Sequence, residues 1–310
     1  MKQAFVVLAA SAVMTGCAAN GDSQAIAEEA TPAFLEPIDY IPSALGPHSW
    51  QVTTTSEMAQ KYFDQGLQMR YAYGMDDAAR SFRMARQEDP DCAMCYWGEA
   101  YALGSFLNGG MTAAKAPYAH EAIEKAVELS GDATELERDL IMAARDRYPA
   151  DYDPDNRRAV DEAFAQRMAA VYEKYPDSHE VAVVYAVALF MLEERRGHRD
   201  INDPDLIHLH GVLTGVLDED ITNPGACHLY IHATESSQKP ELALPCAEYL
   251  SDAVPAASHI QHMPSHTWNE VGLWGRSVRA NTRARHSDLM ARRGAGFSYG
   301  AAHNLHMLLF

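Results

Sequence analysis

The sequence is short of basic residues and of cysteine, and it has no long hydrophobic run beyond its N-terminal segment. Its 310 residues include 25 Lys and Arg against 43 Asp and Glu, which gives a formal net charge of −18. This negative charge disfavours nucleic acid as a partner and favours cations or basic surfaces. No stretch of about 20 apolar residues follows the N-terminal segment, so we predict no transmembrane helix.

The chain has only five cysteines, and four of them lie beyond the N-terminal segment: Cys92, Cys95, Cys227 and Cys246. Tyr96 follows the Cys-x-x-Cys formed by Cys92 and Cys95, and because histidine is missing there, covalent haem attachment is not predicted. Two interpretations stay open. Cys92 and Cys95 form a local disulfide in an oxidising compartment, or the cysteines pack as small apolar groups.

The N-terminal segment resembles a bacterial export signal. Lys2 supplies a basic start, Ala4 to Met14 form an apolar run of about 11 residues, and Met14-Thr15-Gly16-Cys17 resembles a lipobox. The resemblance implies that Cys17 is lipid-modified and anchors the protein to a membrane; an ordinary cleaved signal is the alternative. The expected location is therefore the bacterial envelope, on the periplasmic side of the outer membrane.

Composition and periodicity divide the chain into three parts. Residues 1–17 are the predicted signal peptide, residues 18–45 a flexible tether rich in Ala, Glu, Pro and Ser, and residues 46–310 a helical region. The sequence ends at Phe310 in an apolar helical segment, although repeat arrays need a polar terminal helix. We therefore expect that the protein continues further or that another subunit covers this end.

One helical hairpin carries the clearest repeat signal. Gly66, Ala78, Phe82, Ala85 and Pro90 have the spacing of the small, aromatic and proline positions of a tetratricopeptide repeat. Small residues let two antiparallel helices approach, the aromatic ring fills the gap, and the proline ends the second helix. Later segments fit this pattern more loosely. We predict an all-α fold, a tetratricopeptide-like superhelix of about six hairpins.

Histidines recur with regular spacing towards the C-terminus. His228 and His232 are four residues apart, and His262 and His266 repeat the pair 34 residues later. A tetratricopeptide repeat is about 34 residues long, so both pairs should occupy the same face of consecutive helices. Neighbouring helices lie roughly 8–10 Å apart, which allows imidazoles from both helices to reach one metal ion.

Three more residues are predicted to join these pairs. Glu235 shares the face of the first pair and is a candidate ligand, an orienter of a ligand, or the general base of a catalytic site. His303 and His306 should close the group from the following helix. One tetrahedral ion takes four ligands, so either two ions bind or some of these side chains only orient the ligands.

Pro264 lies between the two histidines of the second pair. A proline inside a helix kinks it at a cost of about 3 kcal/mol, whereas the first helical turn tolerates one. Because the repeat spacing starts this helix near Ser258, we predict a kink at Pro264; a helix that begins at Pro264 is the alternative. His259 and His286 are left out of the predicted site, because His259 starts its helix and His286 lies on a different face of the fold.

Four segments resemble runs found in a family of histidine-rich, tetratricopeptide-like bacterial envelope proteins: Asp89 to Ala100, His228 to Ser237, His262 to His266 and His303 to His306. The resemblance covers most of residues 46–310. It implies the helical-repeat fold and a shared set of histidines, but no activity. One departure is Gly74-Met75, where relatives favour Asn-His, so a contribution from that histidine is missing here.

Three functions remain open. In the first, which we favour, histidines on the concave face bind one or two ions of copper, zinc or iron, and an open coordination position supports metal-dependent oxidation or hydrolysis. In the second, the superhelix is a scaffold that binds a peptide or protein in its concave groove without metal. In the third, the protein carries metal without catalysis. The sequence does not decide whether it is an enzyme.

Overall fold

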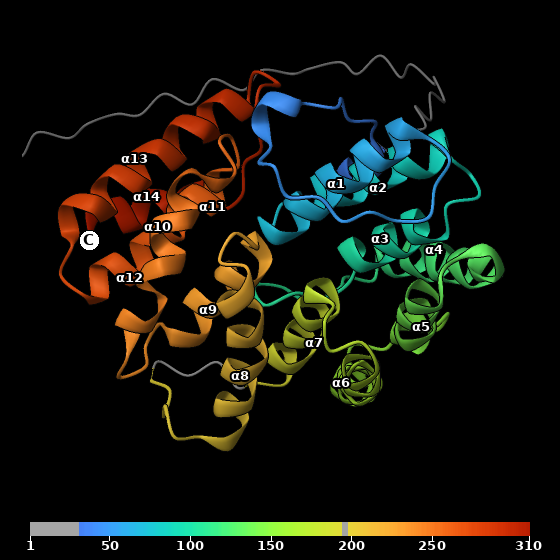
Figure 1. The fold of residues 1–310 in the computed structure, drawn as a ribbon. Coiled ribbons are helices and arrows are strands. Elements are labelled where there is room, and N and C mark those ends of the chain that lie inside the picture. Colours follow the sequence, from blue (N-terminus) through green and yellow to red (C-terminus); the bar gives the residue numbers. More distant parts are fainter. Residues whose placement is uncertain (1–30, 194–197) are drawn as a thin grey trace, which may run out of the picture. The chain divides into compact units, whose positions relative to one another are not determined.

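A computed structural model describes residues 31–193 and 198–310, and within these ranges the fold is all-α (Figure 1). The described chain forms no β-strand, only two isolated bridges. The prediction of an all-α fold is confirmed. Within the same ranges, no helix combines the length and the hydropathy needed to cross a membrane.

The α-helices in chain order are α1 (Glu57–Tyr71), α2 (Met75–Glu88), α3 (Ala93–Leu103), α4 (Ala116–Leu129), α5 (Glu135–Ala144), α6 (Arg157–Lys174), α7 (His179–Leu192), α8 (Pro204–Glu219), α9 (Pro224–Thr234), α10 (Leu244–Ala253), α11 (Ser258–His262), α12 (Pro264–Glu270), α13 (Trp274–Ala291) and α14 (Ala301–Leu309). Short 3-10 helices occur between them, at η1 (Ala33–Leu35), η2 (Pro42–Ala44), η3 (Ser130–Asp132), η4 (Arg145–Arg147) and η5 (Pro240–Ala243).

The first hairpin packs through the residues that carried the repeat signal. Ser56 caps α1, where its hydroxyl accepts a hydrogen bond from the Ala59 N–H at 3.2 Å. The Phe82 ring fills the space between α1, α2 and α3. A Cβ placed on Gly66 would lie 2.9 Å from this ring, and one on Gly98 would lie 2.3 Å from it. Both positions therefore require glycine, because a methyl group would push the helices apart.

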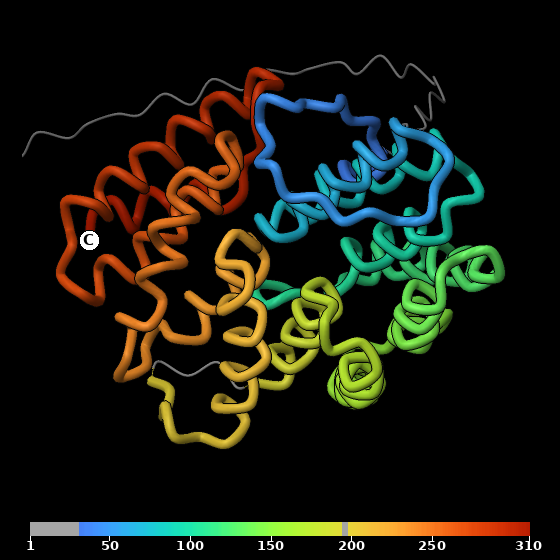
Figure 2. Tube along the Cα trace, viewed as in Figure 1, coloured from blue at the N-terminus to red at the C-terminus, as the bar shows by residue number. Residues whose placement is uncertain are grey.

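Consecutive helices lie side by side along the chain, and the trace in Figure 2 follows them from α1 to α14. Helix α9 contacts α1, α7, α8, α10 and α12. All its residues, from Pro224 to Thr234, are buried. A helix buried all round has no polar face, which explains why α9 shows little apolar periodicity. The two histidines on α9 therefore lie in the interior.

Two disulfides form, which settles the alternative left open for the cysteines. Cys92 and Cys95 bridge at the start of α3, and Cys227 and Cys246 join α9 to α10. The second bridge holds the histidine-bearing α9 against its neighbour.

Part of the predicted tether, residues 32–45, belongs to the folded unit. The predicted signal peptide, Cys17 and residues 18–30 lie outside the described residues. Residues 32–45 pack against the helices: the Phe34 ring lies edge-on to Tyr118, with centroids 5.4 Å apart, and the buried Gln65 side chain accepts from the Ile41 N–H and donates to the Asp39 carbonyl. The compact unit therefore begins at Pro32 and not at residue 46.

Candidate metal centre

Histidine side chains from four helices come together in two groups of three. Within each group, one ring nitrogen of every member lies within 4.8 Å of the others. The first group, here called the buried triad, consists of His228, His232 and His259. The second group, here called the outer triad, consists of His262, His266 and His303. The buried triad combines side chains from α9 and α11, and the outer triad combines side chains from α11, α12 and α14.

The position of α9 follows from local sequence signals. Asn223 caps the helix, with its side-chain oxygen accepting from the Ala226 N–H at 2.9 Å, and Pro224 occupies the first turn. The four-residue spacing puts His228 and His232 on one face, as predicted, with ring centroids 4.9 Å apart.

Pro264 divides the second histidine segment into two helices. Helix α11 ends at His262 and α12 begins at Pro264, so the predicted kinked single helix is corrected to the alternative. Met263 between them keeps right-handed helical angles, and the His266 N–H bonds to its carbonyl at 3.1 Å. The tightened turn brings His262 Nε2 to 2.8 Å from His266 Nε2.

The histidines that face each other across neighbouring helices differ in part from the predicted pairs. His232 on α9 faces His266 as expected, with ring centroids 5.6 Å apart. His228, however, faces His259, at 5.0 Å, and not His262. His259 also lies 5.5 Å from His262 and so stands between the two triads.

His259 was excluded by the sequence argument, and the structure corrects this. Its side chain is 2% exposed, and neither ring nitrogen has a hydrogen-bond partner among the described residues. A buried imidazole N–H without an acceptor is costly. The signal was present in the sequence, because His259 precedes His262 by three residues, the spacing that was accepted for His303 and His306.

His306, in contrast, belongs to neither triad. It is exposed on α14, whereas His303 on the same helix joins the outer triad. His286 is exposed on α13, in agreement with its exclusion.

Glu235 connects the two triads. Its Oε1 accepts from His232 Nδ1 at 2.7 Å, and its Oε2 accepts from His266 Nδ1 at 2.7 Å. Burial would raise the pKa of Glu235, but the two imidazoles more than offset this and hold it well below its ordinary value. The side chain is therefore a carboxylate that orients one imidazole in each triad.

Hydrogen bonds at Nδ1 also orient two other imidazoles. His228 Nδ1 donates to the Tyr71 carbonyl, and the Nε2 on the other side of the ring has no partner in the described ranges. His262 Nδ1 donates to the Asn281 side-chain oxygen at 2.7 Å. The Asn281 amide is held in this orientation because its Nδ2 donates to the Ser277 carbonyl at 3.1 Å.

These contacts create a conflict in the outer triad. His262 and His266 both carry a proton on Nδ1, so in the neutral ring each Nε2 presents a lone pair. The two Nε2 atoms are nevertheless 2.8 Å apart. Two lone pairs at this distance repel unless a cation, either a proton or a metal ion, lies between them. Transition metals bind imidazole nitrogen at about 2.0–2.1 Å, and a metal ion therefore fits this donor arrangement.

Two residues with strained backbone flank the centre. Tyr73 and Ser236 have positive φ, at 58° and 57°, which is uncommon for residues other than glycine. The Tyr73 ring stacks on His259 with centroids 5.3 Å apart and lies 4.2 Å from the ring of His228. Ser236 directly follows Glu235. Such strain costs about 1–3 kcal/mol per residue and clusters at functional sites.

The two triads differ in exposure, although burial lowers the pKa of His262 in the outer triad as well. Burial, then the neighbouring His232, lowers the pKa of His228 well below its ordinary value, and burial, then His228, does the same for the pKa of His259. These rings are neutral at physiological pH and can act as ligands. The outer triad reaches the surface at His303.

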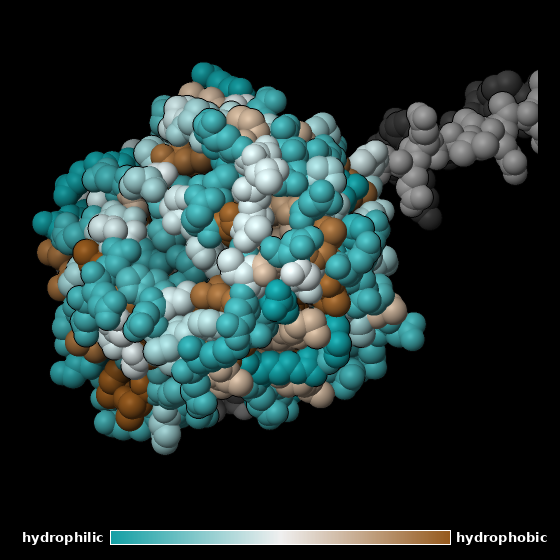
Figure 3. Space-filling model, turned by 45° about the vertical axis from the view of Figure 1, so that its right-hand side comes forward, coloured by the Kyte–Doolittle hydropathy of each residue, from teal (hydrophilic) through white to brown (hydrophobic). Residues whose placement is uncertain are grey.

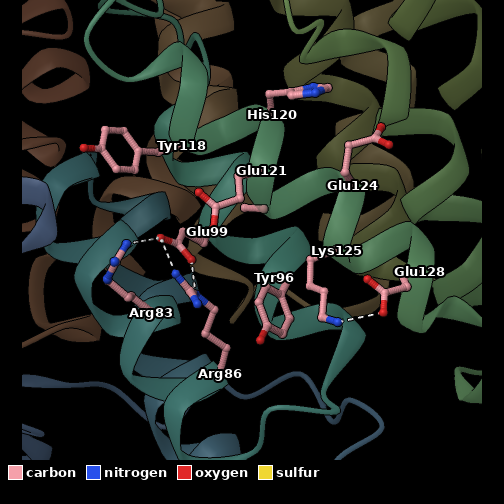
Figure 4. A pocket seen from close by; sticks show the side chains of 11 residues that line it. Arg83, Arg86, Tyr96, Glu99, Tyr118, His120, Glu121, Glu124, Lys125 and Glu128 are labelled. Atoms are coloured by element: carbon pink, nitrogen blue, oxygen red, sulfur yellow. Dashed lines mark hydrogen bonds and ion pairs between the residues drawn. The ribbon is translucent and has the colours of Figure 1, made fainter.

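A separate pocket of about 650 Å³ lies among α2, α3 and α4 (Figure 4). Its basic side chains are paired internally: the buried Glu99 accepts from Arg83 at 3.0 Å and from Arg86, and Lys125 bonds to Glu128 at 2.8 Å. The basic groups drawn there already have carboxylate partners, and the remaining carboxylates, Glu121 and Glu124, come from one helix. This pocket therefore offers weaker chemistry than the histidine centre.

No family model matches the chain, and a comparison with curated proteins finds no significant match. The functional argument therefore depends on the geometry of the two triads.

Proposed function

We propose that this protein binds two transition-metal ions, one in each histidine triad, with Glu235 orienting a ligand of both. The single observation that carries the proposal is the approach of His262 Nε2 to His266 Nε2 at 2.8 Å while both Nδ1 atoms are already held by acceptors. The unpartnered nitrogens of the fully buried His259 support a second ion. Copper, zinc and iron all suit nitrogen ligands.

The proposal includes a tetratricopeptide-like superhelix of about six hairpins as the scaffold, anchored in the bacterial envelope by lipid on Cys17. The packing of Phe82 against Gly66 supports the repeat architecture. The lipobox-like segment before Cys17 supports the anchor. Its location on the periplasmic side of the outer membrane is part of the same proposal.

For Glu235, the contacts favour the role of an orienter over those of ligand and general base. Each carboxylate oxygen accepts from one imidazole Nδ1. A carboxylate with a pKa held well below its ordinary value is also a weak base. We assign it the task of fixing the direction in which His232 and His266 present their Nε2 atoms.

The outer triad is the place where a bound ion could act on a substrate. His303 is exposed and Glu235 is 25% exposed, so a small molecule has access there and not at the buried triad. A bound metal ion would supply Lewis acidity or electron transfer for metal-dependent hydrolysis or oxidation. The same exposure favours a second candidate function, a non-catalytic metal carrier, because an exposed ligand allows exchange.

A peptide-binding scaffold without metal is the weaker alternative. Without metal, only a proton could lie between the Nε2 atoms of His262 and His266 and offset their repulsion. On the face drawn in Figure 3, hydrophilic side chains predominate and the apolar ones are scattered among them, so this face shows no broad apolar surface for a partner.

Metal analysis of protein purified without an affinity tag tests the proposal. We expect about two ions per chain, and the loss of one ion in each of His259→Ala and His262→Ala. His306→Ala is the matched control, because this histidine lies outside both triads, and it should retain both ions. A wild-type protein that binds no transition metal after reconstitution would refute the proposal.

Turnover and transfer separate the two candidate functions. A carrier should release its outer ion to a soluble chelator and show no turnover with model hydrolase or oxidase substrates. An enzyme should turn over such a substrate only when loaded, and His303→Ala should abolish this turnover.

A further inference from the structure

The two triads offer metal ions different surroundings. His228, His232 and His259 are 1%, 4% and 2% exposed. Aromatic rings pack around them: Tyr73 stacks on His259, and Tyr299 lies edge-on to His259 with centroids 5.0 Å apart. In the outer triad, His266 is 14% exposed and His303 is exposed. Water therefore reaches the outer triad and is kept from the buried one.

The ligands of the buried triad are electrically neutral. The group contains three imidazoles and no carboxylate, and an imidazole binds a metal ion as a neutral ligand. An ion placed there keeps its full charge in an apolar environment. The cost of burying a charge grows with its square, so a divalent ion costs about four times as much to bury as a monovalent one.

Charge across the whole centre leads to the same conclusion. Glu235 contacts one imidazole of each triad and contributes one negative charge to both together. Two divalent ions would leave three positive charges without compensation, whereas one monovalent and one divalent ion would leave two. The more exposed triad is the better place for the divalent ion, since water screens its charge.

The number of donors also separates the triads. Zinc in proteins is almost always bound by four ligands. The buried triad presents three donors, and its aromatic surroundings leave little access for water as a fourth. Among the transition metals that bind imidazole, copper is the one with a stable monovalent state, and the monovalent ion accepts three ligands.

We propose that the buried triad of His228, His232 and His259 selects monovalent copper, whereas the outer triad of His262, His266 and His303 binds an exchangeable divalent ion such as zinc. This inference rests on the proposed function, namely that both triads bind metal. It adds that the two sites differ in ion charge, ion identity and exchange rate.

The test reconstitutes the metal-free full chain without oxygen, using monovalent copper and zinc together, and removes unbound metal before analysis. The expected result is about one copper and about one zinc per chain. His259→Gln should lose the copper and keep the zinc, and His303→Gln should lose the zinc and keep the copper. His306→Gln should keep both. A hydrophilic chelator should remove zinc at least about tenfold faster than copper.

X-ray absorption on the wild-type protein keeps the test independent of any variant that fails to fold. The copper edge should be that of the monovalent ion, with nitrogen neighbours from three imidazoles. Zinc in both triads, or copper lost from His303→Gln and kept in His259→Gln, would overturn the inference and leave the proposed function standing. A protein that binds neither metal would overturn both.

Discussion

Lowering the pH should destabilise the metal-free protein, because two fully buried imidazoles cannot accept protons in the folded state. Burial, followed by His232, holds the pKa of His228 well below the ordinary value of 6.5, and burial, followed by His228, does so for His259. In the unfolded chain both rings titrate normally. As the pH falls below 6.5, the unfolded state therefore binds protons that the folded state does not, and unfolding is favoured.

The size of the expected loss in free energy of unfolding follows from this difference in bound protons. The contribution of His228 and His259 to stability is fully present above pH 6.5. It is lost as the pH falls from there towards their folded-state pKa values. Each ring contributes a slope of about 1.4 kcal/mol per pH unit. Between about pH 7.5 and about pH 5.5, the two rings together should lower the free energy of unfolding by about 3 kcal/mol.

Urea unfolding of the metal-free protein, followed by circular dichroism at both pH values, measures this loss. His262 is a third buried imidazole with a lowered pKa and adds to the loss in the wild type. His259→Gln removes one of these groups, so its loss should be smaller by about 1.4 kcal/mol. His306→Gln replaces an exposed histidine and should behave as the wild type. The reasoning is refuted if the wild type loses less than about 1 kcal/mol, or if His259→Gln loses as much as the wild type.

Three further outcomes are expected. Asn281→Leu removes the acceptor for His262 Nδ1 and should weaken metal binding at the outer triad by about 10- to 100-fold in chelator competition; unchanged affinity would remove Asn281 from the site. Phe82→Ala should cost about 3–5 kcal/mol in urea unfolding, because the ring packs on glycines of two neighbouring helices; a cost below about 1 kcal/mol would contradict this packing. Ser236→Gly relieves the positive φ of 57° and should raise thermal stability while weakening metal binding, by loosening Glu235; a gain in both would show that the strain serves no purpose at the site.

The sequence by itself determined the features that depend on local geometry. Helical periodicity identified an all-α chain, because hydrophobic spacing follows directly from the pitch of a helix. The close packing around Phe82 could be expected from small residues at fixed offsets. The four-residue spacing was enough to place His228 and His232 on one face, and the repeat length was enough to pair His232 with His266.

Only the tertiary structure decided how the histidines divide. Whether His259 points inwards depends on the direction in which α11 enters the core, and the contact between His262 and His266 depends on where Pro264 starts a new helix. The ring of Tyr73 comes from a turn far away in the sequence. Such contacts depend on how separate helices pack, and a local pattern of residues carries no information about side chains that a distant segment brings to the same place.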